Sequence, residues 1–326
     1  MAERLSQPCS CIAGGAFLQC CGKDAADRDA YRLLLCLGND ASRPFYGRWT
    51  RHRELVRELV DRAAAGTRRE RCLVLGAGNG NDIPLGHLAD TFTELTLFDL
   101  DETALAAGAG RLTAPQKAGV RLLTGDLTGL AASGAAETVV RLARHGRWPD
   151  LARYLLTLRR KAGLPPPPEL GCGYDLVVSV CVATQLFVPF IGAVAGHSPI
   201  RDRIHAAAAG VTRALSDRLG EIMHRSVAPA GTATPAGAVA FATDILEWNA
   251  ARLGKDCGPA PLAPDSEKID PAAVEGLLRT YSHLKNAGAV PENLTRLFTP
   301  VHAMDWVWAF SDRKQYVVRG FVLHPR

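Results

Sequence analysis

The feature that most constrains the fold is a glycine-rich turn directly after a short apolar segment. The stretch RCLVLGAGNGNDIPL (71–85) runs from the apolar residues CLVL into the spacing Gly-x-Gly-x-Gly, formed by Gly76, Gly78 and Gly80. Glycines between a strand and a helix allow a sharp turn and a close approach of the backbone to a ligand. Taken alone, such a turn suits a dinucleotide, a nucleoside or a purely structural role.

The residues downstream repeat the arrangement of an apolar strand followed by polar residues. The segment 94–105 contains a second strand that ends at Asp99, about one helix and one turn after Gly80. An acidic side chain at this place accepts hydrogen bonds from ribose hydroxyl groups. We predict a third strand in 120–130, ending in Gly-Asp-Leu, and a fourth in 174–186, whose continuous apolar run indicates burial on both faces.

The C-terminal part of the chain supplies the remaining strands. We predict a fifth strand over 237–246 and a hairpin over 304–324, whose two strands are joined by a polar turn. Helical segments fill the gaps, among them 51–65, 201–226 and 271–286. The pattern predicts the α/β class: a doubly wound, Rossmann-like, mostly parallel seven-stranded sheet with a terminal antiparallel hairpin and helical insertions.

This layout resembles the class I S-adenosylmethionine-dependent methyltransferases over about residues 70–326. The shared features are the glycine loop, the acidic end of the second strand, the Gly-Asp-Leu and the terminal hairpin, which Rossmann-type nicotinamide dehydrogenases lack. The resemblance implies S-adenosylmethionine as the cofactor. It implies contacts with the methionine part from Gly76, Ala77, Gly78, Gly80, Val180 and Cys181, with the ribose from Asp99, and with the adenine from Leu100, Asp126 and Leu127.

Departures from related patterns narrow the choice of acceptor. Val74 stands where many family members carry an acidic residue, so Asn79, Asn81 or Asp82 would supply those polar contacts. The fourth strand ends in SVCVATQL rather than the Asn/Asp-Pro-Pro-aromatic motif of DNA adenine methylation, and its loop lacks the Pro-Cys of cytosine methylation. The basic segment 141–163 is interpreted as a solvated helix face, which disfavours nucleic acid as a partner.

Two additions to the minimal fold follow the carboxyl ends of strands, where open α/β sheets bind ligands. A helical insertion at 131–171 and a lid-like segment at 182–236 predict a wall or lid, which suits a small-molecule or peptide acceptor. The protein's part in methyl transfer is alignment and, where needed, a general base, for which histidine is suited. His197 is the first candidate base, His302 follows, and Gln185 is a candidate for orienting the acceptor.

An aromatic and basic segment, SRPFYGRWTRH (42–52), precedes the first strand. Two roles remain open for it. Its aromatic rings and arginines would fold over the cofactor or the acceptor, or the segment would start a helix that packs on the sheet. His52, near its end, is a further candidate base.

The chain opens with four closely spaced cysteines: Cys9, Cys11, Cys20 and Cys21. In a reducing compartment such cysteines are more often metal ligands than disulfides, and four thiolates complete a tetrahedral zinc site. The spacing over 8–22 resembles the SEC-C zinc motif but lacks its basic residues. We predict a structural zinc in an extension over 1–30, with an iron–sulfur cluster or free thiols as alternatives, and a methyltransferase domain over 31–326.

The composition is that of an ordinary globular protein, with 47% hydrophobic and 22% charged residues. No apolar run is long enough to span a bilayer and no signal-peptide pattern opens the chain, so we expect a cytoplasmic protein.

Three functions remain open. They are a small-molecule or peptide methyltransferase of specialised metabolism, which we prefer, an RNA- or ribosome-associated methyltransferase recruited through the cysteines, and a non-catalytic cofactor-binding or metal-sensing protein. The sequence leaves the oligomeric state open.

Overall fold

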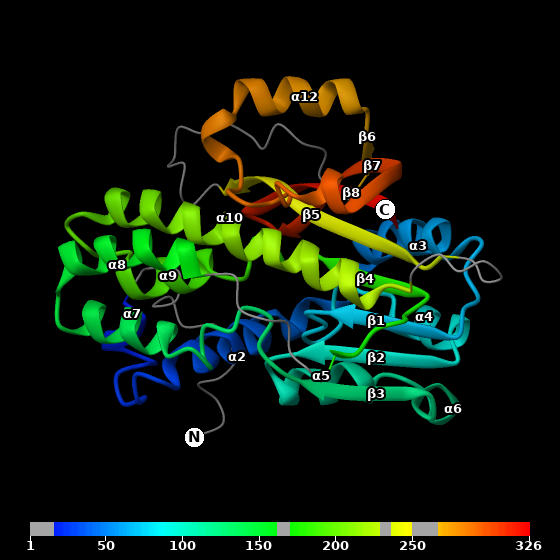
Figure 1. Cartoon of the computed structure of the whole chain (residues 1–326), viewed down its shortest axis with the longest axis horizontal. Helices are drawn as coiled ribbons and strands as arrows, with labels where there is room; N and C mark the ends of the chain where they lie inside the picture. Colours follow the sequence, from blue (N-terminus) through cyan, green and yellow to red (C-terminus); the bar gives the residue numbers. More distant parts are fainter. Residues whose placement is uncertain (1–15, 162–169, 229–235, 250–266) are drawn as a thin grey trace.

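The computed structural model describes residues 16–161, 170–228, 236–249 and 267–326, and it centres on one mixed sheet (Figure 1). The strands are β1 (Arg71–Leu75), β2 (Glu94–Asp99), β3 (Val120–Thr124), β4 (Leu176–Val180), β5 (Ala238–Asn249), β6 (Lys268–Ile269), β7 (Phe298–Ser311) and β8 (Lys314–Pro325). They form an eight-stranded sheet in the order β3-β2-β1-β4-β5-β8-β7-β6.

The sheet confirms the doubly wound topology and corrects the number of strands. Strands β1 to β5 pair in parallel, whereas β8 lies antiparallel between β5 and β7. The predicted terminal hairpin is therefore present. The prediction of seven strands was wrong, because β6 adds an eighth strand at the edge beside β7. It spans only Lys268–Ile269, too short to leave an apolar pattern in the sequence.

The parallel strands place their carboxyl ends along one edge of the sheet. The chain leaves β1 toward β2 and β3, and then crosses to β4 and β5 on the other side. The topological switch point therefore lies between β1 and β4, where open α/β sheets bind their ligands. The residues after β1, β2, β3 and β4 are the ones that this topology brings together.

Helices cover both faces of the sheet. They are α2 (Ala30–Ser42), α3 (Thr50–Ala64), α4 (Leu85–Thr91), α5 (Glu102–Gly110), α6 (Ala114–Lys117), α7 (Ala135–Arg144), α8 (Trp148–Lys161), α9 (Val188–Ala195), α10 (Arg201–Ser226), α12 (Pro271–Thr280) and α13 (Leu294–Leu297), with 3-10 turns η2 (Phe17–Gln19), η3 (Arg43–Tyr46) and η5 (Ser282–Leu284). None of the helices in the described ranges is long and apolar enough to cross a membrane.

The side chains of β1 show why both faces need cover. Because successive strand residues point to opposite faces, Leu73 and Leu75 join one hydrophobic core, while Cys72 and Val74 join the other. The first core is shared with α2 and α7 to α10, and the second with α3, α4 and α5. All four side chains are fully buried, as expected for a strand at the centre of a parallel sheet.

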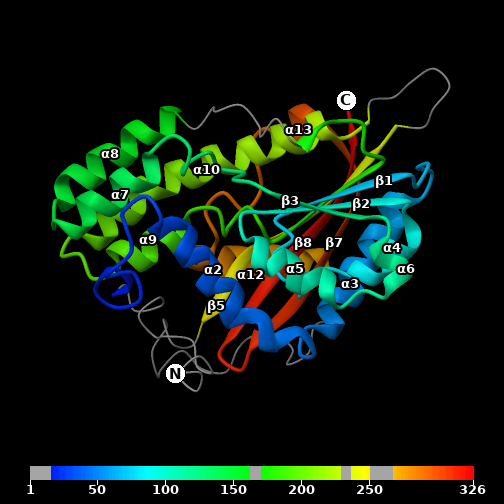
Figure 2. The ribbon, with the colours of Figure 1, turned by 90° about the horizontal axis from the view of Figure 1, so that it is seen from below.

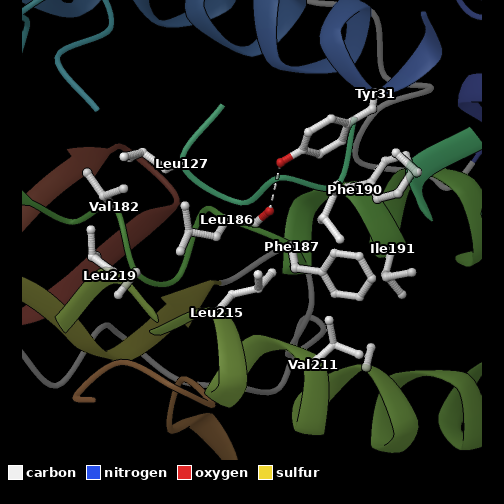
Figure 3. Close-up of a cluster of buried hydrophobic side chains, with 14 of the residues drawn as sticks. Tyr31, Leu127, Val182, Leu186, Phe187, Phe190, Ile191, Val211, Leu215 and Leu219 are labelled. Atoms are coloured by element: carbon white, nitrogen blue, oxygen red, sulfur yellow. Dashed lines mark hydrogen bonds between the residues drawn. The ribbon is translucent and has the colours of Figure 1, made fainter. Parts of the chain in front are cut away.

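Helices α7 to α10 form a group beside the carboxyl ends of the strands (Figures 1 and 2). They comprise the described parts of the insertion 131–171 and of the segment 182–236. Their apolar side chains meet the strand-end loops in a buried cluster, and the hydroxyl of Tyr31 in α2 donates to the Leu186 carbonyl at 3.1 Å (Figure 3). This cluster packs the helical group onto the strand ends, and its roles as an apolar wall or a lid stay predictions.

Candidate functional site

The glycine loop after β1 has an unusual backbone. Gly76, Gly78 and Gly80 all adopt left-handed conformations, with φ of +67°, +46° and +62°, and the residues between them do not. Alternation of this kind turns backbone N–H groups toward one side and makes a concavity for acceptor atoms. The N–H of Gly78 donates to Oδ2 of Asp99 at 2.8 Å. Ala77 is buried, so the loop is part of the packed structure.

Asp99 ends β2, at the place that the sequence predicts. Its Oδ2 accepts from Gly78 and its Oδ1 accepts from the N–H of Asp101 at 2.9 Å, so both oxygens are fixed in direction. Each carboxylate oxygen has a second lone pair for a ligand hydroxyl. Burial raises the pKa of Asp99, and the two backbone hydrogen bonds oppose that rise. Leu100 follows, half-buried against the core.

Hydrogen-bond acceptor atoms lie close to the backbone of Gly78. A Cβ atom at Gly78 would lie 3.0 Å from Oδ1 of Asn39 and 4.0 Å from Oδ2 of Asp99. The missing side chain therefore lets the polar groups of Asn39 and Asp99 lie close to the backbone, and we call this arrangement the polar cradle. In the next residue, Oδ1 of Asn79 is buried without a hydrogen-bond partner among the described residues. The hydroxyl and amino groups of an adenosyl amino acid are donors of the kind that these acceptors require.

Asp126, predicted at the adenine, organises the loop after β3. Its Oδ1 accepts from the N–H and the hydroxyl of Thr128 at 2.8 and 2.6 Å, and its Oδ2 accepts from the N–H of Ala131 at 3.0 Å. Leu127 is buried beside it, and its carbonyl accepts from Nε of Arg218 in α10 at 2.9 Å. Arg218 was not predicted from the sequence, and the contact of Asp126 with adenine stays a prediction.

The end of β4 lies against the glycine loop. Val180 and Cys181 are buried, and Cys181 has a left-handed φ of +53°, which is uncommon for a residue other than glycine. Strained backbone of this kind concentrates at functional sites. A Cβ atom at Gly76 would lie 2.4 Å from Cγ2 of Val182, so the turn after β4 packs directly on the loop. The glycine loop and the turn after β4 are therefore in direct contact at the topological switch point, through Gly76 and Val182.

A buried carboxyl group that was not predicted from the sequence lies on the neighbouring strand β5, just beyond the residues that pair with β4. Asp244 accepts from the hydroxyl of Thr184 at 2.6 Å and from Nδ2 of Asn286 at 3.0 Å. Burial raises the pKa of Asp244 to about 7 and that of Asp82 to about 7. Burial, Asp244 and Asp82 together raise the pKa of the Cys181 thiol well above its ordinary value. In the sequence, the single acidic residue inside the apolar run AVAFATDIL was the signal that could have indicated this buried carboxyl group.

Replacement of Asp244 by asparagine should change how stability depends on pH. The folded pKa of about 7 exceeds the ordinary value of 3.8, because burial disfavours the carboxylate. The unfolded state therefore releases this proton first, so stability from this group is complete below pH 3.8 and is lost as the pH rises to about 7. One pKa unit corresponds to about 1.4 kcal/mol. Between pH 3.8 and about 7, the free energy of unfolding of the wild type should therefore fall by about 4 kcal/mol through this group, and that of the variant should not.

Urea unfolding at about pH 4 and about pH 8 measures this difference. We expect the free energy of unfolding to fall less with pH in Asp244→Asn than in the wild type. Asp24→Asn is the matched control, because the side chain of Asp24 is 89% exposed. An identical fall in the wild type and in Asp244→Asn would show that Asp244 is ionised in the folded protein at neutral pH.

The three predicted catalytic residues lie in different places. His197 is exposed in the helical group, where its Nε2 lies 3.1 Å from Nε2 of Gln19 and its ring packs edge-on against Trp148. His302 lies on β7, where burial and the nearby Arg62 of α3 lower its pKa. Gln185 is exposed in the turn after β4, at the strand-end edge. Their roles stay predictions. Of the three, Gln185 follows β4, the strand whose end lies against the glycine loop.

Of the two roles left open for the segment 42–52, the structure shows the helix start that packs on the sheet, and a contact with the cofactor or acceptor stays a prediction. Trp49 and His52 are buried at the start of α3, where the His52 ring stacks on Trp308 with centroids 4.1 Å apart. Burial lowers the pKa of His52 to about 3, so this histidine stays neutral in the core. Tyr46, in contrast, is 40% exposed and lies beside the glycine loop.

The predicted zinc ligands are only partly within the described residues. Cys9 and Cys11 lie outside them, whereas Cys20 and Cys21 are exposed, with Sγ atoms 4.0 Å apart. Within the described ranges, no group of three or more His, Cys, Asp or Glu side chains is arranged to hold a metal ion. The four-sulfur site therefore stays a prediction.

No protein-family model matches the chain, and no curated protein matches it. Several solved structures align at low similarity. N-methyltransferase NodS from Bradyrhizobium japonicum WM9, in complex with S-adenosyl-L-homocysteine, aligns with a TM-score of 0.41 and 13% identity over 85% of this chain and 89% of that chain. A putative methyltransferase from Bacillus halodurans C-125 gives 0.40 and 10% over 83% and 99%, and TrmN from Thermus thermophilus gives 0.38 and 16% over 83% and 48%. These similarities are distant, so the function proposed for this chain rests on its own strand order and strand-end residues.

Proposed function

We propose that this protein is an enzyme that binds S-adenosylmethionine and transfers its methyl group to a small-molecule or peptide acceptor. One observation carries the proposal: Asp99, at the end of β2, is oriented by the N–H of Gly78 beside the polar cradle. The terminal antiparallel strand β8, inserted between β5 and β7, supports a methyltransferase over a nicotinamide dehydrogenase.

The residues of the chain would hold and orient the ligand. Asp99 would accept from the ribose hydroxyls, and the loop from Gly76 to Gly80 would approach the methionine part. Leu100 and Leu127 would pack near the adenine, while Val180 and Cys181 would line the methionine side. The cofactor supplies an activated methyl group when bound, so the protein's work is alignment and exclusion of water.

The acceptor would bind beside the turn after β4, outside the packed apolar cluster of the helical group. That cluster would support the site from behind rather than line it. Its members include Leu127, Val182, Leu186, Phe187, Phe190, Ile191, Val211, Leu215 and Leu219 (Figure 3). For an acceptor that must lose a proton, the pair Thr184–Asp244 lies just beyond the end of β4, so we add Asp244 to His197 as a candidate base.

Turnover of the methyl donor tests the proposal. The purified protein is incubated with methyl-labelled S-adenosylmethionine and sets of small molecules, short peptides and RNA, and label transfer is followed. Transfer to a small molecule or peptide is expected. Transfer to RNA with salt-sensitive binding would favour the RNA-associated alternative, and cofactor binding without any transfer would favour the non-catalytic one.

We further propose that Cys9, Cys11, Cys20 and Cys21 hold one structural zinc ion. Zinc–sulfur bonds of about 2.3 Å in a tetrahedral site separate the sulfurs by about 3.8 Å. The separation of 4.0 Å between Cys20 and Cys21 is close to that value. Elemental analysis should find about one zinc per chain, lost in a Cys20→Ser/Cys21→Ser double variant. Metal-free protein with four rapidly reacting thiols would contradict this site.

A further inference from the structure

Three side chains from separate parts of the chain meet on the outer side of the glycine loop. Tyr46 lies at the end of η3, Arg53 in α3, and Arg111 directly after α5. The Cζ atoms of Arg53 and Arg111 lie 3.9 and 4.2 Å from the centroid of the Tyr46 ring. Guanidinium groups at such distances are attracted to the ring electrons. We refer to Tyr46, Arg53 and Arg111 as the Tyr46 cluster.

Both arginines also donate to the backbone of the loop. Nη1 of Arg53 donates to the carbonyls of Tyr46 and Asn81 at 2.5 and 2.6 Å. Nη1 of Arg111 donates to the carbonyl of Asn79 at 2.5 Å, and its Nη2 donates to Oδ1 of Asn81 at 2.7 Å. Hydrogen bonds from a charged donor are stronger than those between neutral groups. They therefore fix the carbonyl groups of Asn79 and Asn81 toward the arginines.

The amide groups of the same two asparagines are held by α2. Nδ2 of Asn79 donates to the Asn39 carbonyl, and Nδ2 of Asn81 donates to the Ser42 carbonyl, both at 2.6 Å. Both asparagines are 3% exposed. Residues 79–81 are thus held by the Tyr46 cluster and by the last turn of α2, while Gly78 presents its N–H to Asp99.

We propose that Tyr46, Arg53 and Arg111 are positioning residues that hold the glycine loop in its ligand-binding conformation before the cofactor arrives. This inference rests on the proposed function. A loop with three left-handed glycines has many alternative conformations, because glycine loses more backbone freedom on ordering than any other residue. If the loop were free, cofactor binding would have to order it, at the expense of affinity. The cluster removes that cost by fixing the carbonyls of Asn79 and Asn81.

Paired variants separate this role from a general contribution to stability. Tyr46→Leu removes the ring, whereas Tyr46→Phe keeps it. Arg111→Met removes the charged donors, whereas Arg111→Lys keeps one. Arg57→Met, at an exposed position in the same helix as Arg53, is the control. The affinity for S-adenosylmethionine is measured by calorimetric titration of the full chain. The melting temperature is measured by calorimetric scanning of the full chain without ligand.

We expect Tyr46→Leu and Arg111→Met to bind S-adenosylmethionine about tenfold more weakly, which corresponds to about 1.4 kcal/mol. Tyr46→Phe and Arg57→Met should bind like the wild type, and Arg111→Lys should lie between. Because the cluster is at the surface, the melting temperature should move by only a few degrees. Wild-type affinity in both Tyr46→Leu and Arg111→Met would overturn the inference.

Hydrogen exchange of the ligand-free protein decides the matter independently of cofactor binding. The amides of residues 76–82 should exchange faster in Arg111→Met than in the wild type, while those of β1 stay protected. Failure of the wild type to bind S-adenosylmethionine would count against the proposed function. Unchanged exchange of 76–82 would count against the Tyr46 cluster alone.

Discussion

Replacement of Asp99 by alanine is expected to weaken the binding of S-adenosylmethionine by about 100-fold or more. The two oxygens of Asp99 are fixed by the N–H groups of Gly78 and Asp101, at 2.8 and 2.9 Å, and each has a lone pair left for a ribose hydroxyl. A hydrogen bond to a charged acceptor contributes about 1.5–3 kcal/mol. The loss of two such bonds amounts to about 3–6 kcal/mol, or about two to four powers of ten in affinity.

Calorimetric titration of the wild type, Asp99→Ala and Asp99→Asn measures this effect. Asp99→Asn keeps one acceptor oxygen and should fall between the other two. Asp90→Ala is the control, because Asp90 lies exposed on α4 and contacts Gln116 rather than the glycine loop. Since Asp99→Ala also leaves the N–H of Gly78 unbonded, the melting temperature is recorded alongside. Equal affinity in the wild type and in folded Asp99→Ala would refute the assignment.

Replacement of Gly78 by alanine is expected to weaken cofactor binding by about 10- to 100-fold. The added Cβ would lie 3.0 Å from Oδ1 of Asn39 and 4.0 Å from Oδ2 of Asp99, and would therefore fill the cradle. The residue also has a left-handed φ of +46°, which costs about 1–2 kcal/mol for a residue with a side chain. We therefore expect both a loss of affinity and a lower free energy of unfolding.

A second glycine-to-alanine change separates the two effects. Gly276 lies in α12, and a Cβ built there meets nothing within 4 Å. Gly276→Ala should raise the free energy of unfolding by up to about 1 kcal/mol, because alanine favours the helix, and should leave cofactor affinity unchanged. Titration together with urea unfolding gives both quantities for each variant. Full cofactor affinity in Gly78→Ala would mean that the ligand does not use this cradle.

The strand-end residues were predictable because the topology alone brings them together. Once 71–85 is interpreted as a strand followed by a glycine turn, the parallel sheet places the end of β2 beside it. Asp99 therefore needed no long-range information beyond the order of the strands. The apolar run in β4 and the terminal hairpin were equally clear, because burial on both faces and a polar turn leave strong local patterns.

The missed residues depend on contacts between distant parts of the chain. Asp244 meets Asn286, and Arg218 meets Leu127, and no periodicity links the members of either pair. His197 was chosen from its place in a loop after β4, but that loop belongs to the helical group, where the ring packs on Trp148. His197 lies between α9 and α10, two helices of that group. Tertiary packing, rather than local sequence, decides this position.

The most direct test of the central claim is a calorimetric titration of the unmodified, full-length protein with S-adenosylmethionine. The account predicts binding of one molecule per chain with an affinity in the micromolar range, about −8 kcal/mol. The demethylated cofactor should compete for the same site, because the ribose, adenine and methionine contacts are shared. A folded protein that binds neither compound at millimolar concentration would contradict the assignment of the strand-end site.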